Sequence, residues 1–178
     1  QGTLQKRLLR PVHPLFTNLT ENLSALPLRF ALMVPILTGT LLWLGGSIVT
    51  HDWVQLLLIP LSLFGAFMLT FLVMTCIGTL SLIWESSIAV FDLWLGFYTV
   101  FSGYVMPLEL FPPSVRGVVG RLPFRQMLAF PVENMLGMVS RSAALFDLAL
   151  QWSWVLFFLL ATRVLWGIGM KRFGAFGG

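Results

Sequence analysis

The feature that most constrains this chain is a series of long apolar runs that contain no charged side chain. Residues 30–50 form a run of 21 positions, and residues 53–84 form one of 32. A helix needs about 20 apolar residues to cross the hydrocarbon core of a bilayer. The 178-residue chain is 10% charged, whereas soluble domains have roughly 25% charged residues. The sequence therefore predicts an integral membrane protein.

Two further runs are long enough to cross. Residues 88–106 are interrupted only by Asp92, and residues 144–170 by Asp147 and Arg163. As a helix, residues 53–84 would be about 48 Å long, so this crossing must tilt, kink at Pro60 or project beyond the bilayer. We expect an all-α, polytopic fold with four spanning helices.

Between the last two runs, residues 107–141 are apolar but repeatedly interrupted by proline. The helical pieces that remain have about ten residues and are too short to span. Backbone at membrane depth must satisfy its own hydrogen bonds, so such pieces lie in the interface or enter and return beside other helices. We expect an external re-entrant helical hairpin, marked by Pro107, Pro112, Pro123, Phe124 and Pro131.

The first 28 residues differ from the remaining 29–178, which form the expected transmembrane domain. Phe16, Leu19, Leu23 and Leu26 recur at helical spacing with polar residues between them, which predicts an amphipathic helix. An even number of crossings puts both chain ends on one side of the membrane. Basic residues favour the cytoplasm for that side; they are Lys6, Arg7, Arg10, Arg29, Lys171 and Arg172.

Several chemistries are excluded by residues that the sequence lacks. It contains one cysteine, two histidines and no phosphate-binding Gly-x-x-x-x-Gly-Lys-Ser/Thr loop. We expect no catalytic residue, no metal site and no cofactor bound by this chain, so ATP-driven work would need a partner. The net charge of +4 comes from scattered basic residues, which suits anionic lipid headgroups better than nucleic acid.

Two of the three charges inside the expected crossings, Asp92 and Arg163, lie at similar depths. Asp92 and Arg163 would sit about 10 and 12 Å from the inner surface, and a lone ion near mid-bilayer costs roughly 2.5–3.5 kcal/mol. An intramembrane ion pair between them is therefore one expectation. The other is that Arg163 extends to the inner headgroups while Asp92 takes a hydroxyl or water partner.

An aromatic row recurs at one-turn spacing along the third run: Trp94, Phe97, Tyr98 and Phe101. These side chains could line the route of an amphipathic substrate. The same spacing also fits packing against other helices or contact with lipid.

Three pieces of the sequence carry a family resemblance. They read Gly2-Thr3-Leu4 through Leu8-Leu9-Arg10-Pro11-Val12-His13-Pro14-Leu15-Phe16, Ser102-Gly103-Tyr104 through Met106-Pro107-Leu108 with Phe111-Pro112 and Leu122-Pro123-Phe124, and Lys171-Arg172-Phe173-Gly174-Ala175-Phe176-Gly177-Gly178. Together they resemble one family, the ABC-2 type exporter permeases, particularly the six-helix branch near the daunorubicin-resistance and viologen-exporter subunits. The opening piece resembles the segment after that family's second membrane helix, the middle piece its external hairpin, and the last piece its cytoplasmic tail. The branch has two further helices upstream, which have no counterpart here, and the chain opens at Gln1; an upstream part is therefore expected.

The resemblance implies a permease of the bacterial inner membrane that works with a second permease copy or paralogue. Cytoplasmic ABC ATPase subunits would bind ATP and magnesium and drive export of an amphipathic, drug-like or lipid-like substrate by alternating access. The implied coupling helix would dock on the ATPase through Lys6, Arg7, Leu8, Leu9, Arg10, Pro11, His13 and Phe16.

Other interpretations stay open at this point. The amphipathic segment could simply rest on lipid. The chain could also be a membrane scaffold or assembly subunit that moves nothing. A membrane enzyme is disfavoured, because no nucleophile, base or metal cluster converges in the sequence.

Overall fold

A computed structural model describes residues 39, 50, 52–80 and 87–175, with side chains at all of these except 87 and 170–175. The chain divides into two compact units, Gln1–Ile48 and Val49–Gly178. Of the first unit only Gly39 is described, and it is helical. The expected coupling segment lies outside the described residues, and so does the first expected crossing except for Gly39 and Thr50.

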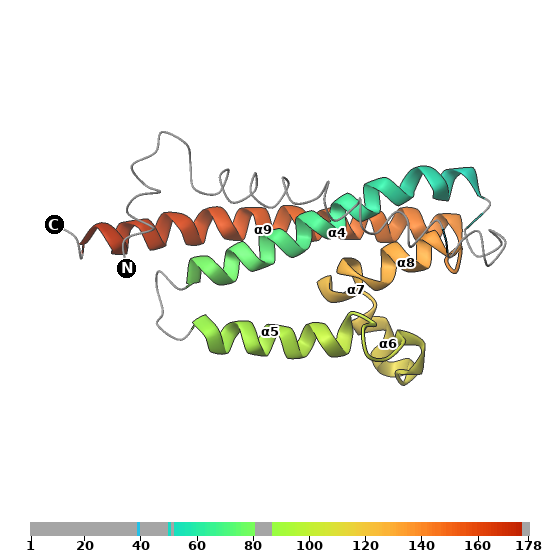
Figure 1. The fold of residues 1–178 in the computed structure, drawn as a ribbon, viewed down its shortest axis with the longest axis horizontal. Helices are drawn as coiled ribbons and strands as arrows, with labels where there is room; N and C mark the ends of the chain where they lie inside the picture. Colours follow the sequence, from blue (N-terminus) through green and yellow to red (C-terminus); the bar gives the residue numbers. More distant parts are fainter. Residues whose placement is uncertain (1–38, 40–49, 51, 81–86, 176–178) are drawn as a thin grey trace. The chain divides into compact units, whose positions relative to one another are not determined.

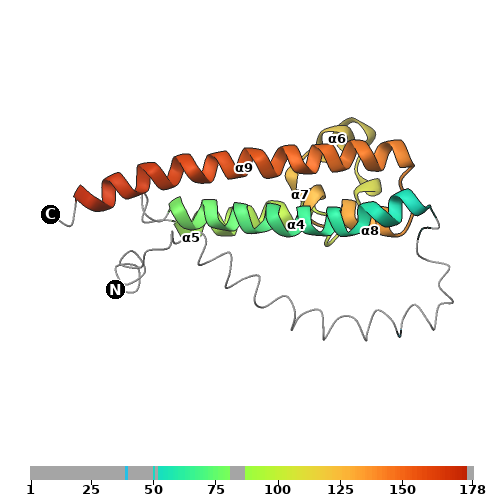
Figure 2. The same ribbon diagram turned by 90° about the horizontal axis from the view of Figure 1, so that it is seen from above.

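Two long helices form the body of the second unit. Helix α4 spans Trp53–Leu80 and helix α9 spans Arg141–Ala175, with 28 and 35 residues. They pack against each other and run in the same direction (Figures 1 and 2). Helix α4 continues through Pro60. Both helices are long and apolar enough to cross a membrane.

A third helix, α5, spans Ser87–Phe101 and runs opposite to α4 (Figure 1). The prediction that this run would be helical to residue 106 is wrong at its end. Gly103 has a φ of +86°, a left-handed conformation that stops a helix, and the Tyr104 N–H donates to Ser102 Oγ over 3.3 Å. With 15 residues α5 is about 22 Å long, less than the ~30 Å hydrocarbon core.

The chain between α5 and α9 contains only short helices. They are the 3-10 helix η1 and the α-helices α6, α7 and α8, which span Leu108–Leu110, Pro113–Val119, Pro123–Met127 and Ala129–Met135. Proline begins α6 and α7, where its missing N–H costs no hydrogen bond. The expected division of this segment into pieces too short to span is confirmed, and the pieces lie toward the end where α4 and α9 begin (Figure 1).

Burial in α4 and α9 is the reverse of that in a soluble protein. Only 33% and 28% of their most apolar windows are buried. Leucine and phenylalanine side chains face outward, as at Leu57 and Phe146. The buried polar residues include Gln55, Ser62, Thr79, Gln126, Asn134, Gln151 and Thr162. Since a core helix of a soluble protein is mostly buried, this pattern fits helices whose outer faces contact lipid.

A small apolar cluster joins the helices; we call it the core cluster. It consists of Leu69, Leu72 and Val73 from α4, Met127 from α7 and Val155 from α9. Trp94 and Tyr98 of α5 pack against it. Helix α7 thus reaches the middle of the packed helices. No strand occurs in the part of the chain that the structure describes.

Candidate functional site

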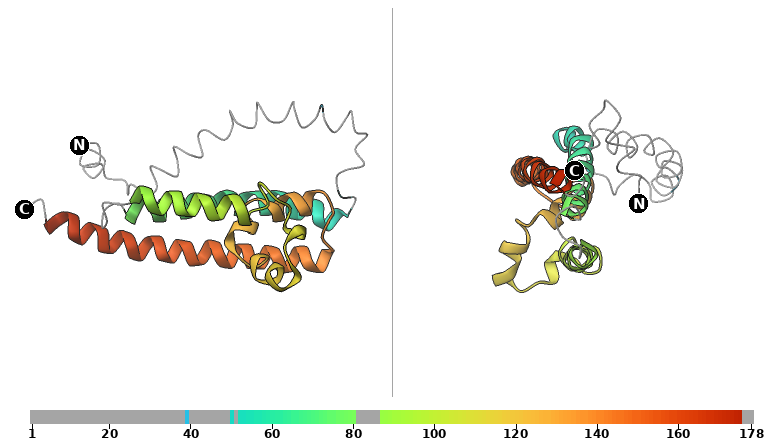
Figure 3. Two further views of the ribbon diagram at one scale, coloured as in Figure 1. Left: turned by 90° about the horizontal axis from the view of Figure 1, so that it is seen from below. Right: turned by 90° about the vertical axis from the view of Figure 1, so that its left-hand side faces the viewer.

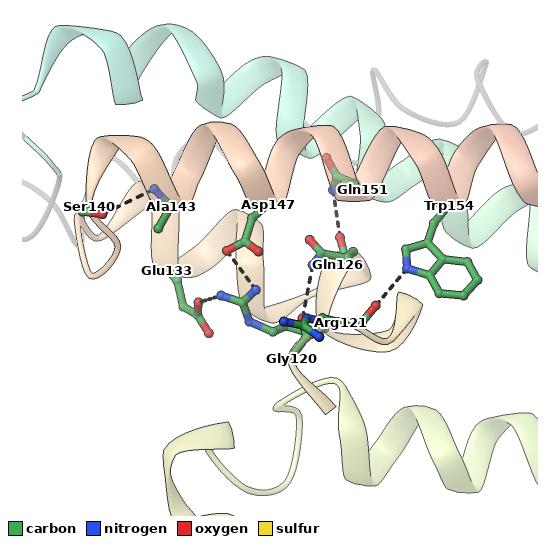
Figure 4. A network of polar contacts seen from close by, with 10 residues as sticks. Gly120, Arg121, Gln126, Glu133, Ser140, Ala143, Asp147, Gln151 and Trp154 are labelled. Carbon is green, nitrogen blue, oxygen red and sulfur yellow. Dashed lines mark hydrogen bonds and ion pairs between the residues drawn. The ribbon is translucent and has the colours of Figure 1, made fainter. Parts of the chain in front are cut away.

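A buried glutamine joins three helices. The Gln151 Nε2 donates to the carbonyl oxygens of Ser62 on α4, over 3.0 Å, and of Gln126 on α7, over 2.8 Å. All three residues have no exposed surface. Figure 4 shows Gln151 pointing from α9 toward the hairpin. In an apolar environment such hydrogen bonds hold helices together, because an unpaired amide there is costly.

The space for Gln151 depends on Gly65 of α4. A Cβ atom added at Gly65 would overlap Gln151 Oε1 and come within 2.8 Å of its Cδ. A side chain at this position would force the Gln151 amide to move from its two hydrogen bonds.

We expect Gly65→Ala to lower the free energy of unfolding by about 2 kcal/mol, because overpacking costs about 1–3 kcal/mol. Denaturant titration of the protein in detergent measures the loss. Gly78→Ala in the same helix is the control, since a Cβ there meets no atom within 4 Å. Adding Gln151→Ala to Gly65→Ala should cost less than the sum of the two changes; simple additivity would contradict the contact.

Three charged side chains form a largely buried group beside this amide. Arg125 of α7 contacts Glu133 of α8 at 2.5 Å and Asp147 of α9 at 2.9 Å. The three side chains are 13%, 22% and 11% exposed. Burial disfavours the charge on Arg125, but the two carboxylates outweigh it, so its pKa lies above the ordinary value. We call Arg125, Gln126, Glu133, Asp147 and Gln151 the hairpin anchor (Figure 4).

A second set of contacts closes the end where α4 and α9 begin. Arg141 Nη2 and Nε contact the two Asp52 carboxylate oxygens at 2.9 and 3.0 Å, and the guanidinium lies 5.9 Å from the centre of the Trp53 ring. The Gln55 Nε2 donates to the Val139 carbonyl over 2.6 Å, and the Thr50 N–H donates to the Met135 carbonyl over 3.0 Å. The turn before α4 is therefore tied to the chain before α9.

The hydrogen bonds from Arg141 hold the pKa of Asp52 below its ordinary value of 3.8. A lowered pKa contributes stability that is present above the ordinary value and is lost as the pH falls through the lowered one. We expect the difference in melting temperature between the wild type and Asp52→Asn to stay constant from pH 7 to 5 and to shrink below pH 3.8. A difference that already fell between pH 7 and 5 would contradict this contact.

The chain between α5 and α9 also contacts α9 far from the start of that helix. The Trp154 Nε1 donates to the Arg121 carbonyl over 2.9 Å, and Trp154 lies 13 residues after Arg141, or about 20 Å along the helix. Farther along the chain, the Asn134 Nδ2 donates over 3.4 Å to the carbonyl of Gln55, near the start of α4. The chain thus contacts α9 well after its start at Arg121 and contacts the start of α4 at Asn134.

The aromatic row of α5 forms two stacked pairs. Trp94 and Tyr98 stack with ring centres 5.1 Å apart and face the core cluster. Phe97 and Phe101 stack at 6.0 Å, and Phe124 of α7 lies 6.3 Å from each. Of the four residues of this row, Phe97 is exposed, whereas Trp94, Tyr98 and Phe101 are half-buried.

The structure does not bring Asp92 and Arg163 together. Both residues are exposed. The ion pairs among the described residues are made by Arg125 and Arg141, with Glu133, Asp147 and Asp52 as their partners.

The hairpin residues singled out by the sequence have separate local roles. Pro107 and Pro112 precede η1 and α6, and Pro123 begins α7. Phe124 contacts α5, and Pro131 is buried in α8.

The amides of the anchor are the residues that sequence reasoning missed. Gln126 and Gln151 stand in apolar surroundings, which is itself a signal, because polar groups in membrane helices are usually buried between helices. Asp147 was treated only as an interruption of a crossing. The anchor offers fixed geometry rather than reaction chemistry, and within the described ranges no group of His, Cys, Asp or Glu could hold a metal ion.

Comparison with curated proteins and with solved structures gives no match. The family model described as ABC-2 family transporter protein matches residues 1–177. This confirms the resemblance to ABC-2 type permeases. Because the match covers nearly the whole chain, the protein belongs to the ABC-2 transporter family and is an integral membrane permease subunit.

Proposed function

We propose that this chain is the permease subunit of an ATP-driven exporter that moves amphipathic, drug-like or lipid-like molecules out of the cytoplasm or inner leaflet. The observation that carries the proposal is the family match over residues 1–177, which implies association with ABC ATPase subunits. A second permease copy or paralogue completes the pathway. ATP and magnesium bind to the ATPase and not to this chain.

The hairpin acts as a rigid external element of this permease. Its deepest described tie, from Trp154 to Arg121, lies about 20 Å along α9 from Arg141, which supports a re-entrant path. The hairpin anchor fixes this segment against α9. Gln151 of α9 binds Gln126, and Asp147 of α9 binds Arg125. Such contacts suit alternating access, in which packed helices move as rigid bodies.

The coupling helix receives the motion of the ATPase. Residues 6–16 combine basic residues, two prolines and apolar side chains, a composition that fits a stiff amphipathic segment docked in a groove on a partner protein. Both ends of the chain are cytoplasmic in this proposal, because four crossings put them on one side and the basic residues favour the inner side.

Affinity purification in a mild detergent tests the proposal. We expect an ATPase with a phosphate-binding loop to copurify with this chain, and ATP hydrolysis to move a fluorescent amphiphile across reconstituted vesicles. A scaffold subunit that moves nothing predicts neither result. Copurification without any ATP-dependent movement would therefore contradict the exporter and favour the scaffold.

A further inference from the structure

Two tryptophans of α9 mark the level of a membrane boundary. Trp152 and Trp154 lie 19 and 17 residues before Lys171, which is about 26–28 Å along the helix. This length is close to the ~30 Å thickness of the hydrocarbon core. Tryptophan is enriched at membrane boundaries, where its ring is apolar and its N–H is polar. If Lys171 lies at one boundary, the two tryptophans therefore lie at the opposite one.

The backbone of Arg121 is held at this level. Its carbonyl accepts the hydrogen bond from Trp154 Nε1 (Figure 4), and its N–H donates to the Val118 carbonyl over 3.0 Å. The Arg121 side chain is exposed. No ion pair or side-chain hydrogen bond joins its guanidinium to another described residue. The structure thus fixes where Arg121 lies and leaves its charge available.

The other two arginines between α5 and α9 are already bound within the protein. Arg125 contacts the two carboxylates of the hairpin anchor. Arg116 Nη2 donates to the carbonyl oxygens of Glu109 and Phe111, to the second over 3.2 Å. Lipid phosphates are the abundant anions at a membrane boundary, and a guanidinium can bind a phosphate through two parallel hydrogen bonds. Arg121 is the arginine of this segment that is free to do so.

Exposed apolar side chains on the same segment indicate contact with lipid. Tyr104, Val105 and Val118 are between 64% and 71% exposed. In the end-on view of Figure 3, the short helices that follow α5 project to one side of α4 and α9. Exposed apolar residues combined with basic ones are typical of segments that lie in the bilayer interface.

We propose that Arg121 binds the phosphate of an anionic phospholipid, whose acyl chains contact Val118. In the topology proposed above, this lipid belongs to the outer leaflet. It is a resident ligand that fastens the end of α6 to the membrane, and it is not a transported substrate. The inference depends on the chain being embedded in a membrane, and it holds whether or not the complex exports anything.

A fluorescent label beside Arg121 tests the proposal. Val118→Cys in a Cys76→Ser background would carry a bimane group, and the purified protein with its copurifying partners would be placed in phosphatidylcholine nanodiscs. Phosphatidylglycerol and phosphatidylcholine with identical brominated acyl chains are then titrated in separate nanodiscs, since bromine quenches the label at short range. The variants are Arg121→Gln and, as the matched control, Arg163→Gln, which removes an exposed arginine eight residues before Lys171.

Both brominated lipids should quench the label. Phosphatidylglycerol should reach half-maximal quenching at a mole fraction about fivefold lower, because one arginine near an anionic lipid surface contributes about 1 kcal/mol, which is a factor of about five. Arg163→Gln should keep this preference. Arg121→Gln should abolish it while leaving the quenching by phosphatidylcholine unchanged.

Equal quenching by the two lipids would overturn the inference, and so would a preference that survives Arg121→Gln. Absence of quenching by either lipid would overturn it by showing that a second copy, another protein or water covers Val118. Weaker quenching by phosphatidylcholine in Arg121→Gln would also contradict it, because Arg121 would then position the segment instead of recognising an anionic headgroup.

Discussion

Arg125→Met should lower the free energy of unfolding by about 3–5 kcal/mol, because removing one member of a buried ion group leaves its partners charged and unpaired. The partners here are Glu133 and Asp147, whose side chains are 22% and 11% exposed. The loss should also release α7 from α9, since Asp147 binds Arg125 at 2.9 Å. Denaturant titration in a defined detergent measures the stability.

The control variant keeps Arg125→Met and also neutralises the two carboxylates that this substitution leaves unpaired. Arg125→Met combined with Glu133→Gln and Asp147→Asn should recover a large part of the loss, because neutral amides cost far less to bury than unpaired carboxylates. If the triple variant is as unstable as Arg125→Met, the loss comes from the packing of the arginine side chain, and the charges of the hairpin anchor contribute little.

Leu9→Asp combined with Phe16→Asp should abolish ATP-driven transport and copurification of the ATPase. Both residues belong to the segment proposed to dock on the ATPase, and a carboxylate buried in an apolar groove carries a large desolvation cost. Vesicle transport and quantitative mass spectrometry of the purified complex measure the two losses.

Thr17→Asp combined with Asn18→Asp is the matched control, because it adds the same charges among the polar residues of the amphipathic helix. This variant should keep its ATPase and its transport. Survival of both activities in Leu9→Asp with Phe16→Asp would contradict docking and favour a helix that rests on lipid.

The apolar runs predicted α4 and α9 because length and lack of charge decide whether a helix can face lipid over ~30 Å. The prolines likewise predicted the short helices of the hairpin, since proline interrupts a helix through local sterics. The end of α5 was missed because it depends on one left-handed glycine, Gly103, in a run that stays apolar to Met106.

The hairpin anchor was not predictable in the same way. Gln151 contacts carbonyls that lie 25 and 89 positions away in the chain, and no local pattern encodes such a meeting. The proposed Asp92–Arg163 pair illustrates the same limit. Matching depths along two helices say nothing about the directions in which the side chains point, and the structure leaves both residues exposed.

The accessible side of residues 6–16 tests the central claim most directly, because an ATPase can drive this permease only if it reaches that segment. Val12→Cys in a Cys76→Ser background should react with a membrane-impermeant maleimide only after the cells are permeabilised. Leu110→Cys on η1, where the leucine is 67% exposed, should react in intact cells. Labelling of Val12→Cys in intact cells would contradict the account.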